Sequence, residues 1–409
     1  MRVAYLCADP GIPVFGTKGA SVHIQEIVRA FQRRGDQVTI YCSRRGDIVP
    51  ADLATVEVVE IAVRAPDAAS REIAVAATAR LLAAAAIADG CDLLYERYSL
   101  FSTATAEVKA ATGVRCVLEV NAPLIQEQRD HRVLADEDGA IAATRRCVDS
   151  ADVVACVSGA VADWITALTG GSAAERTLVS PNGVNTTRIA PAPRSTGVPA
   201  RAAFTIGFVG TLKPWHGVEV LLRAATIAAA RYPGGQEWRL VIAGSGPEEK
   251  ALRHRARELF SAQGCLAVEF TGAVAPEEIP QLLRSFDVAV APYPQAAAAD
   301  QYFSPLKVYE YLAAGIPVIA SAIGQIPSII THTVTGLLVQ PGSDEELASA
   351  LLALQADPGL RRRLGAAART AAVEHHDWST VLARVLAPLD RAAPFPAVPA
   401  RTHQEAVTR

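Results

Sequence analysis

The stretch FSPLKVYEYLAAG places a serine, a proline, a lysine and a glutamate close together between two apolar runs. Ser304 suits a helix N-cap and Pro305 the first helical position, so the sequence predicts a helix that ends at Gly315. At the helix start, the backbone N–H groups of Leu306 and Lys307, the helix dipole and the lysine charge all favour an anion.

Glu310 lies about one turn further into this predicted helix. A carboxylate is repelled by phosphate, but its two oxygens can accept hydrogen bonds from the vicinal hydroxyls of a ribose. The stretch therefore predicts a sugar-nucleotide site, with the diphosphate at the helix start and the ribose on Glu310. The alternative is an ordinary helix in which Lys307 and Glu310 are surface charges.

Glycine-rich turns follow several apolar runs. In FVGTLKPWHGVEVLL, Gly210 and Gly217 bracket Lys213 and His216, whose cationic side chains could reach a diphosphate. A tight turn with solvated charges is the alternative. In VIAGSGPEEKAL, the turn at Gly244 is a weak signal that packing explains equally well.

Two further turns allow the backbone to approach a ligand. FTGAVAPEE presents backbone near Val274, which could read a base edge, and DPGIPVFGTKGASVH places Gly16 and Gly19 before a helix. The spacing of these glycines is not GxGxxG, which argues against a dinucleotide fingerprint and a nicotinamide oxidoreductase.

Short β-rich runs alternate with helical patterns along both halves of the chain, which predicts doubly wound parallel sheets in an α/β fold. Ligands of such sheets bind at the carboxyl ends of the strands, so two facing domains would form a cleft. The expected segments are an amino-terminal domain, a linker, a donor-side domain, a carboxy-terminal helix crossing back and a disordered tail: 1–185, 186–203, 204–374, 375–390 and 391–409.

Composition limits the possible function classes. The 409 residues are 50% hydrophobic with a net charge of −3, which gives no electrostatic case for nucleic acid. The apolar run at the amino terminus is too short for a signal peptide, and no window of about 20 residues predicts a membrane span. Seven cysteines without a CxxC pair indicate a reduced protein, and we expect a cytoplasmic location. The oligomeric state is not indicated.

Candidate acceptor-binding residues follow the strands of the first half. They are Arg97, Tyr98, Gln126, Arg129 and His131. Metal ligands are not expected: ADEDG contains a DxD pattern at Asp136 but lies between helical stretches, and the adjacent His375 and His376 cannot share a helix face.

Taken together and in order, these segments resemble a glycosyltransferase of the two-domain GT-B architecture, in the large retaining family 4. The resemblance spans nearly the whole chain. The segments that carry it are GTKGASVHIQEIVRAFQRRGDQVTIYC, SADVVACVSGAVADWI, LVSPNGVNTTRIAP, FVGTLKPWHGVEVLLRA, LVIAGSGPEEKAL, FTGAVAPEEIPQLLRSFDVAVAPYP and FSPLKVYEYLAAGIPVIAS.

The resemblance implies two glutamates separated by seven residues. Glu310 matches the second, which holds the ribose, but the first falls at Tyr302, so that Tyr302 or Asp300 would contact the transferred sugar instead. In the phosphate clamp the family's arginine and lysine positions hold Thr211 and His216, which leaves Lys213 as the expected cation.

The resemblance also implies a nucleotide-sugar donor on the second domain and a hydroxyl-bearing acceptor on the first, and we expect the donor to be a UDP-sugar. Front-face attack with retention would follow, with the leaving group stabilised by the Gly19 N–H, Lys213, Lys307 and the helix start. Asn121 stands where the family often has a sugar-facing histidine; a cap is the alternative. We expect no metal or cofactor and no nucleophilic side chain. A soluble small-molecule or natural-product acceptor is favoured over a lipid-linked one.

Two other functions remain compatible with this architecture. A nucleotide-sugar epimerase would turn over the donor without an acceptor. A catalytically silent homologue would bind nucleotide without transfer, an alternative to which the missing first glutamate gives some weight.

Overall fold

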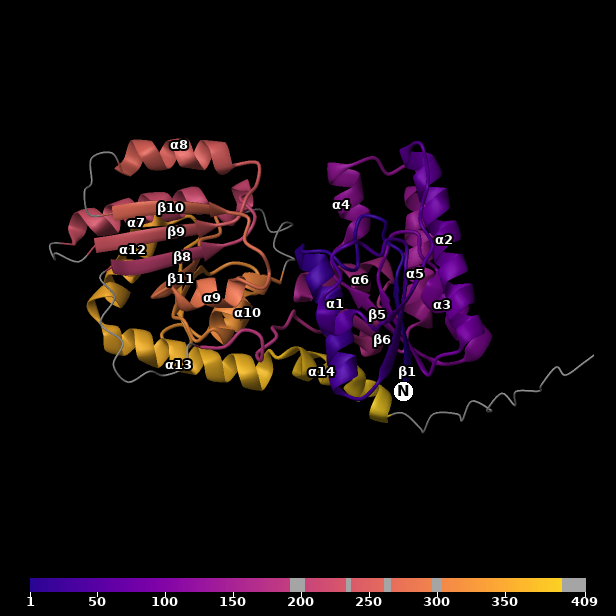
Figure 1. Cartoon of the computed structure of the whole chain (residues 1–409). Helices are drawn as coiled ribbons and strands as arrows, with labels where there is room; N and C mark the ends of the chain where they lie inside the picture. Colours follow the sequence, from indigo (N-terminus) through magenta and orange to yellow (C-terminus); the bar gives the residue numbers. More distant parts are fainter. Residues whose placement is uncertain (192–202, 233–236, 261–265, 296–303, 392–409) are drawn as a thin grey trace, which may run out of the picture.

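The computed structural model describes residues 1–191, 203–232, 237–260, 266–295 and 304–391. Two α/β domains lie side by side in Figure 1. Among the helices in these ranges, none combines the length and apolar character that a membrane crossing requires.

In the described part of the first domain, seven strands form a parallel sheet in the order β3-β2-β1-β4-β5-β6-β7. The strands are β1 (Arg2–Cys7), β2 (Gln37–Cys42), β3 (Glu57–Glu60), β4 (Leu93–Arg97), β5 (Arg115–Val120), β6 (Val153–Cys156) and β7 (Thr177–Val179). The α-helices are α1 (Gly19–Arg33), α2 (Ala68–Asp89), α3 (Ala104–Thr112), α4 (Leu124–His131), α5 (Glu137–Ser150) and α6 (Gly159–Leu168), with short 3-10 turns at Ala51–Leu53 and Ala174–Arg176.

The described part of the second domain holds a six-stranded parallel sheet in the order β10-β9-β8-β11-β12-β13. Its strands are β8 (Ala203–Val209), β9 (Glu237–Ala243), β10 (Leu266–Gly272), β11 (Val288–Ala291), β12 (Val318–Ser321) and β13 (Leu337–Val339). Its helices are η3 (Pro214–His216), α7 (Val218–Arg231), α8 (Glu249–Phe260), α9 (Ile279–Arg284), α10 (Leu306–Ala313), α11 (Ile326–Ile329), α12 (Asp344–Ala356) and α13 (Pro358–His375), and α14 (Trp378–Arg391) follows.

Strand β1 shows why the strand sequences are apolar throughout. Side chains alternate between the two faces of a strand, and Val3, Tyr5 and Cys7 enter one hydrophobic core while Ala4 and Leu6 enter another. Because helices cover both faces of the sheet, neither set can be polar. The doubly wound architecture predicted from the apolar runs is confirmed.

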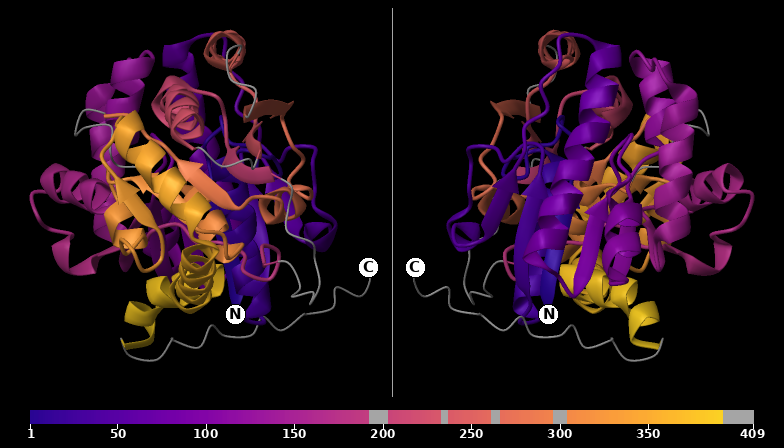
Figure 2. Two further views of the ribbon diagram at one scale, coloured as in Figure 1. Left: turned by 90° about the vertical axis from the view of Figure 1, so that its left-hand side faces the viewer. Right: turned by 90° about the vertical axis from the view of Figure 1, so that its right-hand side faces the viewer.

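The chain crosses twice between the domains, and the two crossings are hydrogen-bonded to each other. Val184 N donates to His376 O at 2.8 Å, and the Thr186 hydroxyl donates to Asp377 at 2.7 Å. Beyond this point α14 packs on α1 through Trp378 and a series of valines and leucines. Figure 1 shows α13 along the second domain and α14 continuing onto the first, and Figure 2 places these helices at the end of the molecule where the amino terminus lies.

The described segments can be compared with the expected boundaries. The first residues of the expected linker 186–203 are packed, since Ile189 is fully buried, and β8 already begins at Ala203. The rest of that linker, and the expected tail beyond Arg391, lie outside the described residues.

Candidate active site

The amino-terminal ends of α1 and α10 meet between the two domains (Figure 1). Gly19 is the first residue of α1 and Leu306 the first of α10, and a Cβ atom on Gly19 would lie 3.3 Å from Leu306 Cδ1. Each helix start offers backbone N–H donors and the positive end of a dipole. The fold therefore sets two anion-favouring helix ends against each other, one from each domain.

The ammonium group of Lys307 is buried beside these ends and has no hydrogen-bond partner among the described residues. Its Nζ lies 4.1 Å from the ring centroid of Phe208 and 5.6 Å from that of Tyr293. A Cβ atom on Gly210, where φ is +150°, would lie 2.6 Å from Nζ, so glycine permits this close approach. Burial lowers the pKa of Lys307 to about 7, although the charge of Glu310 acts to raise it. Among the described residues, no hydrogen-bonding partner offsets this buried charge.

Glu310 occurs one turn later on α10 and is paired with an arginine from the crossing segment. Its Oε1 lies 3.6 Å from Nη2 of Arg188, whose Nη1 donates to Pro276 O at 3.2 Å. Burial raises the pKa of Glu310, and the charge of Arg188 opposes this rise. Arg188 thus links Glu310 to the loop after β10, a contact that the sequence analysis did not anticipate.

The turn after β8 presents one cation rather than two. His216 Nδ1 donates to the carbonyl of Thr211, and burial, with the charges of Lys307 and Lys213, lowers the pKa of His216 to about 4. The ring is therefore neutral at pH 7, and the predicted positive charge on His216 is wrong. Lys213 is half-buried, with Nζ 4.5 Å from the ring centroid of the exposed Trp215.

Gly244, predicted as a weak ligand signal, has a packing reason. Its N–H donates to Gly272 O at 2.8 Å, and a Cβ atom there would lie only 1.9 Å from Gly210 O. The residue supports the turn that positions Gly210. Val274 is half-buried two residues beyond β10.

Ser304 does not cap α10, which corrects the prediction. The N-cap residue is Pro305, without a side-chain cap bond. Ser304 Oγ instead accepts from Asn182 N at 3.1 Å and lies 3.1 Å from the hydroxyl of Tyr309, while its carbonyl accepts from Asn182 Nδ2 at 2.8 Å. The serine ties the start of α10 to the segment after β7.

On the first domain a buried carboxylate organises the candidate acceptor side. Glu119 Oε1 accepts from Tyr95 at 2.7 Å and from His23 at 2.7 Å, while Oε2 accepts from Asn121 at 3.0 Å and from Arg97 at 3.4 Å. Burial acts to raise its pKa, but the charge and hydrogen bond of His23, with Arg97 and Tyr95, hold the pKa of Glu119 at about 2. Asn121 is oriented by this carboxylate and does not serve as a helix cap.

The other acceptor candidates are dispersed. The Tyr98 hydroxyl pairs with Thr144 at 2.8 Å inside the domain core, so its predicted role at the acceptor side is wrong. Gln126, Arg129 and His131 all lie on α4; Gln126 is half-buried and the other two are exposed. Arg129 is already paired with two acidic neighbours.

The possible replacements for the first glutamate, Tyr302 and Asp300, lie outside the described residues. Asp136 of the DxD pattern accepts from Gly139 N at 2.8 Å and caps α5. In the part of the chain that the structure describes, no group of three or more His, Cys, Asp or Glu side chains is arranged to hold a metal ion.

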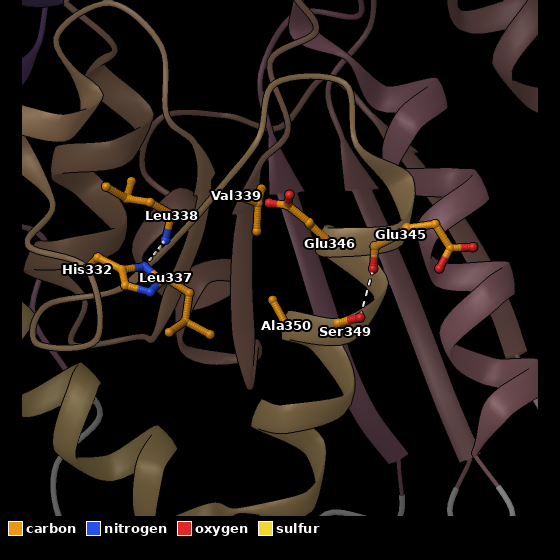
Figure 3. Close-up of a pocket in the computed structure, with 8 residues that line it drawn as sticks. All are labelled: His332, Leu337, Leu338, Val339, Glu345, Glu346, Ser349 and Ala350. Carbon is orange, nitrogen blue, oxygen red and sulfur yellow. Dashed lines mark hydrogen bonds between the residues drawn. The ribbon is translucent and has the colours of Figure 1, made fainter.

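A cavity of about 380 Å³ lies elsewhere, along the edge strand β13 and α12 (Figure 3). Its rim is mostly apolar, and the outward N–H groups of the strand are already used. Leu338 N donates to His332 Nδ1 at 3.0 Å, and Gln340 N donates to Glu346 Oε2 at 2.8 Å. No residue of the helix-end site lines this cavity.

Comparisons with known proteins agree with this geometry. Residues 17–188 match the model of "Glycosyltransferase Family 4", and residues 203–357 match that of "Glycosyl transferases group 1". The chain is 30% identical over 290 residues to a GDP-mannose-dependent alpha-(1-6)-phosphatidylinositol monomannoside mannosyltransferase of Mycobacterium tuberculosis H37Rv, covering 67% of this chain and 73% of that protein. The chain belongs to glycosyltransferase family 4. It is a hexosyltransferase.

Other relatives and solved structures extend the comparison. A D-inositol 3-phosphate glycosyltransferase of Kribbella flavida is 30% identical over 255 residues, 59% of this chain and 57% of that protein. Anabaena Alr3699/HepE, solved in complex with UDP, superposes with a TM-score of 0.66 at 19% identity over 96% of this chain and all of that one. A glycosyltransferase from Rickettsia africae gives 0.68 at 16% identity over 96% of this chain and 99% of that one. The GT-B fold predicted from the sequence is thereby confirmed.

Four residues of this candidate site were missed by the sequence analysis: His23, Glu119, Asn182 and Arg188. Glu119 had a visible signal, since it is the one acidic residue in the apolar strand run RCVLEV. Asn182 and Arg188 were inside quoted motifs but had no individual signal, because their partners lie far along the chain.

Proposed function

We propose that this glycosyltransferase moves a hexosyl group from a nucleotide-diphosphate sugar, preferentially a UDP-sugar, to a hydroxyl group of a small soluble acceptor with retention of anomeric configuration. The observation that carries the proposal is the buried Lys307 ammonium, which has no partner in the described part of the chain and lies beside Gly210 and the starts of α1 and α10. A diphosphate supplies the partner that this charge lacks.

The proposed mechanism depends on how the site stabilises the negative charge that develops on the leaving diphosphate. As the bond between the anomeric carbon and the phosphate oxygen breaks, negative charge grows on the diphosphate, where Lys307, Lys213 and the helix-end amides stabilise it. The acceptor oxygen attacks the same face of the oxocarbenium-like sugar, and the departing phosphate oxygen takes the acceptor proton. Glu310 accepts from the ribose hydroxyls, and Asn121, held by Glu119, faces the sugar. We assign no protein nucleophile, no metal ion and no cofactor.

The names of the relatives define the main competing donor and acceptor. The mycobacterial relative uses GDP-mannose, and other relatives glycosylate an inositol phosphate. GDP is therefore the nucleotide against which UDP must be compared, and a phosphorylated polyol is the acceptor against which a neutral one must be compared.

A thermal-unfolding panel tests the proposal. UDP, GDP, ADP, TDP and CDP are each added with and without EDTA to the wild type, to Lys307→Met and to Lys250→Met, which removes an exposed lysine on α8. A nucleotide at a hundred times its dissociation constant adds about 2.7 kcal/mol to the stability of the folded state. We expect the largest shift from UDP, unchanged by EDTA and in Lys250→Met, and reduced in Lys307→Met. A larger GDP shift would overturn the UDP assignment.

Binding and transfer separate the alternatives. Binding with donor turnover in the absence of any acceptor, giving an isomerised sugar, would identify an epimerase. Binding without any turnover across donor and acceptor panels would identify a silent homologue. No shift with any nucleotide would contradict the site assignment itself.

A further inference from the structure

A continuous chain of buried and half-buried polar side chains connects the acceptor side of the first domain to the start of α10 in the second. Asn121 donates to Glu119 at 3.0 Å, and Glu119 accepts from His23 at 2.7 Å. On its other side the His23 ring contacts Asn182 Oδ1 at 2.7 Å, and Asn182 makes two hydrogen bonds to Ser304. His23 is the single ring through which this connection passes.

Both ring nitrogens of His23 lie against oxygen atoms of neighbouring side chains. Glu119 Oε1 is the oxygen of an ionised carboxylate that also accepts from Tyr95, so His23 Nε2 must donate to it. Asn182 Nδ2 donates to the carbonyl of Ser304, so Asn182 Oδ1 faces the ring and Nδ1 must donate as well. A ring that donates from both nitrogens is an imidazolium.

The surroundings keep this cation in place. His23 is 6% exposed, and the edge of Trp378 from α14 lies against it with 4.8 Å between ring centroids. The charged or titratable groups of the same cluster are Glu119 on β5, Arg97 and Tyr95 on β4 and Tyr5 on β1. Among the described residues Glu119 is the one anionic partner within bonding distance of His23, so the second ring nitrogen is left to contact Asn182, which in turn bonds to Ser304 of the second domain.

We propose that His23 is a positioning residue: its imidazolium holds Glu119 and Asn121 on one side and Asn182 and Ser304 on the other, and so aligns the acceptor side with the start of the donor helix. This role rests on the proposed function, because Asn121 and α10 are assigned to sugar and donor there. His23 itself contacts neither substrate. Its loss should therefore misalign the two halves of the site while disturbing the nucleotide contacts at Lys307 and Gly210 much less.

Two pairs of variants test the proposal. In His23→Gln, one amide donor group replaces the two ring nitrogens, and the buried Glu119 loses its charged partner. The double variant His23→Gln/Glu119→Gln removes the charge from both partners. The matched controls are His254→Gln and His254→Gln/Glu258→Gln, at an exposed histidine–glutamate pair on α8 with 3.2 Å between Nε2 and Oε1. Each variant is measured for UDP and GDP binding, for kcat and KM, and for deuterium exchange in the first turn of α10.

We expect His23→Gln to lower kcat 10- to 100-fold, to change nucleotide affinity less than threefold, and to increase exchange at the start of α10. The double variant should recover folding stability relative to His23→Gln but not kcat, since the link to Asn182 is still weakened. The exposed controls should match the wild type. A fall in nucleotide affinity equal to the fall in kcat, or unchanged kcat, would overturn the positioning role.

Two readouts do not depend on activity, so a failure of this inference can be distinguished from a failure of the proposed function. In wild-type protein with ¹⁵N-labelled histidine at pH 7, the His23 signals, identified by their loss in His23→Gln, should show a proton on both ring nitrogens. Exchange at the start of α10 should rise in His23→Gln even if no donor is turned over. A neutral ring, or unchanged exchange, would refute the inference whether or not the enzyme transfers a hexose.

Discussion

Replacing Lys307 by methionine should make the folded protein more stable and its nucleotide binding weaker. The ammonium is buried on the rings of Phe208 and Tyr293 without an acceptor among the described residues. Methionine keeps an unbranched stem that packs on these rings and removes the unpaired charge. The site therefore holds a charge that the fold alone does not stabilise.

The pKa of Lys307 sets the size of the effect. A fall from 10.5 to about 7, at 1.36 kcal/mol per pKa unit, gives an upper limit of about 5 kcal/mol. The unfolded chain keeps the proton up to pH 10.5, so the destabilisation is fully present below pH 7 and disappears as pH rises to 10.5. Relaxation and water reduce this figure, and we expect Lys307→Met to gain about 1–3 kcal/mol at pH 6.

Thermal unfolding at pH 6, with and without UDP, measures both effects. A gain of this size raises Tm by about 2–4 °C per kcal/mol for domains of this length. Loss of a hydrogen bond to a charged group weakens nucleotide binding by about 1.5–3 kcal/mol, so the UDP-induced shift should shrink. Lys250→Met, at an exposed site, should change neither quantity. A less stable Lys307→Met protein with an undiminished UDP shift would refute the reasoning.

Three further predictions follow from other contacts. Affinity for an intact UDP-sugar, measured by calorimetry between pH 6 and 9, should fall by up to about tenfold per pH unit above pH 7. The cause is that Lys307 loses its proton there, while His216, with a pKa of about 4, stays neutral throughout. An affinity that does not change with pH would contradict this. Glu310→Gln should keep the fold but lose about 1–3 kcal/mol of nucleotide binding, and equal affinity would exclude the ribose contact. Gly244→Ala should lower the free energy of unfolding in denaturant by about 3 kcal/mol or more, because its Cβ atom would lie 1.9 Å from Gly210 O. Gly272→Ala, where a Cβ atom meets nothing, should lower it by about 1–2 kcal/mol from the positive φ alone. Similar losses in the two variants would show that the turn at Gly244 adjusts freely.

Local patterns predicted most of the fold. Twelve apolar runs became strands because burial on both faces leaves a strong sequence signal. Strand β7 (Thr177–Val179) was missed because three residues, two half-buried and one exposed, carry little periodicity. The start of the helix after Ser304 was predicted within a residue and its end within two, yet its N-cap was wrong. A local rule favours Ser304 as N-cap, and a distant partner, Asn182, takes its hydroxyl instead.

The site was predictable only where neighbours in sequence are neighbours in space. Lys307 and Glu310 share one helix, so a single stretch of sequence was enough to propose them together. The link from His23 to Glu119 spans 96 residues and that from His23 to Asn182 spans 159, so no spacing in a single sequence reveals them. The approach of Gly210 to Lys307 is equally invisible, since it depends on how β8 and α10 pack.

Release of nucleoside diphosphate from nucleotide sugars is the most direct test of the central claim. Wild type, Lys307→Met and Lys250→Met would each be incubated with UDP- and GDP-hexoses and a panel of neutral and phosphorylated hydroxyl acceptors, with and without EDTA. The account predicts acceptor-dependent release of UDP by the wild type and Lys250→Met, unaffected by EDTA and strongly reduced in Lys307→Met. Full release by Lys307→Met, or release that EDTA abolishes, would contradict it.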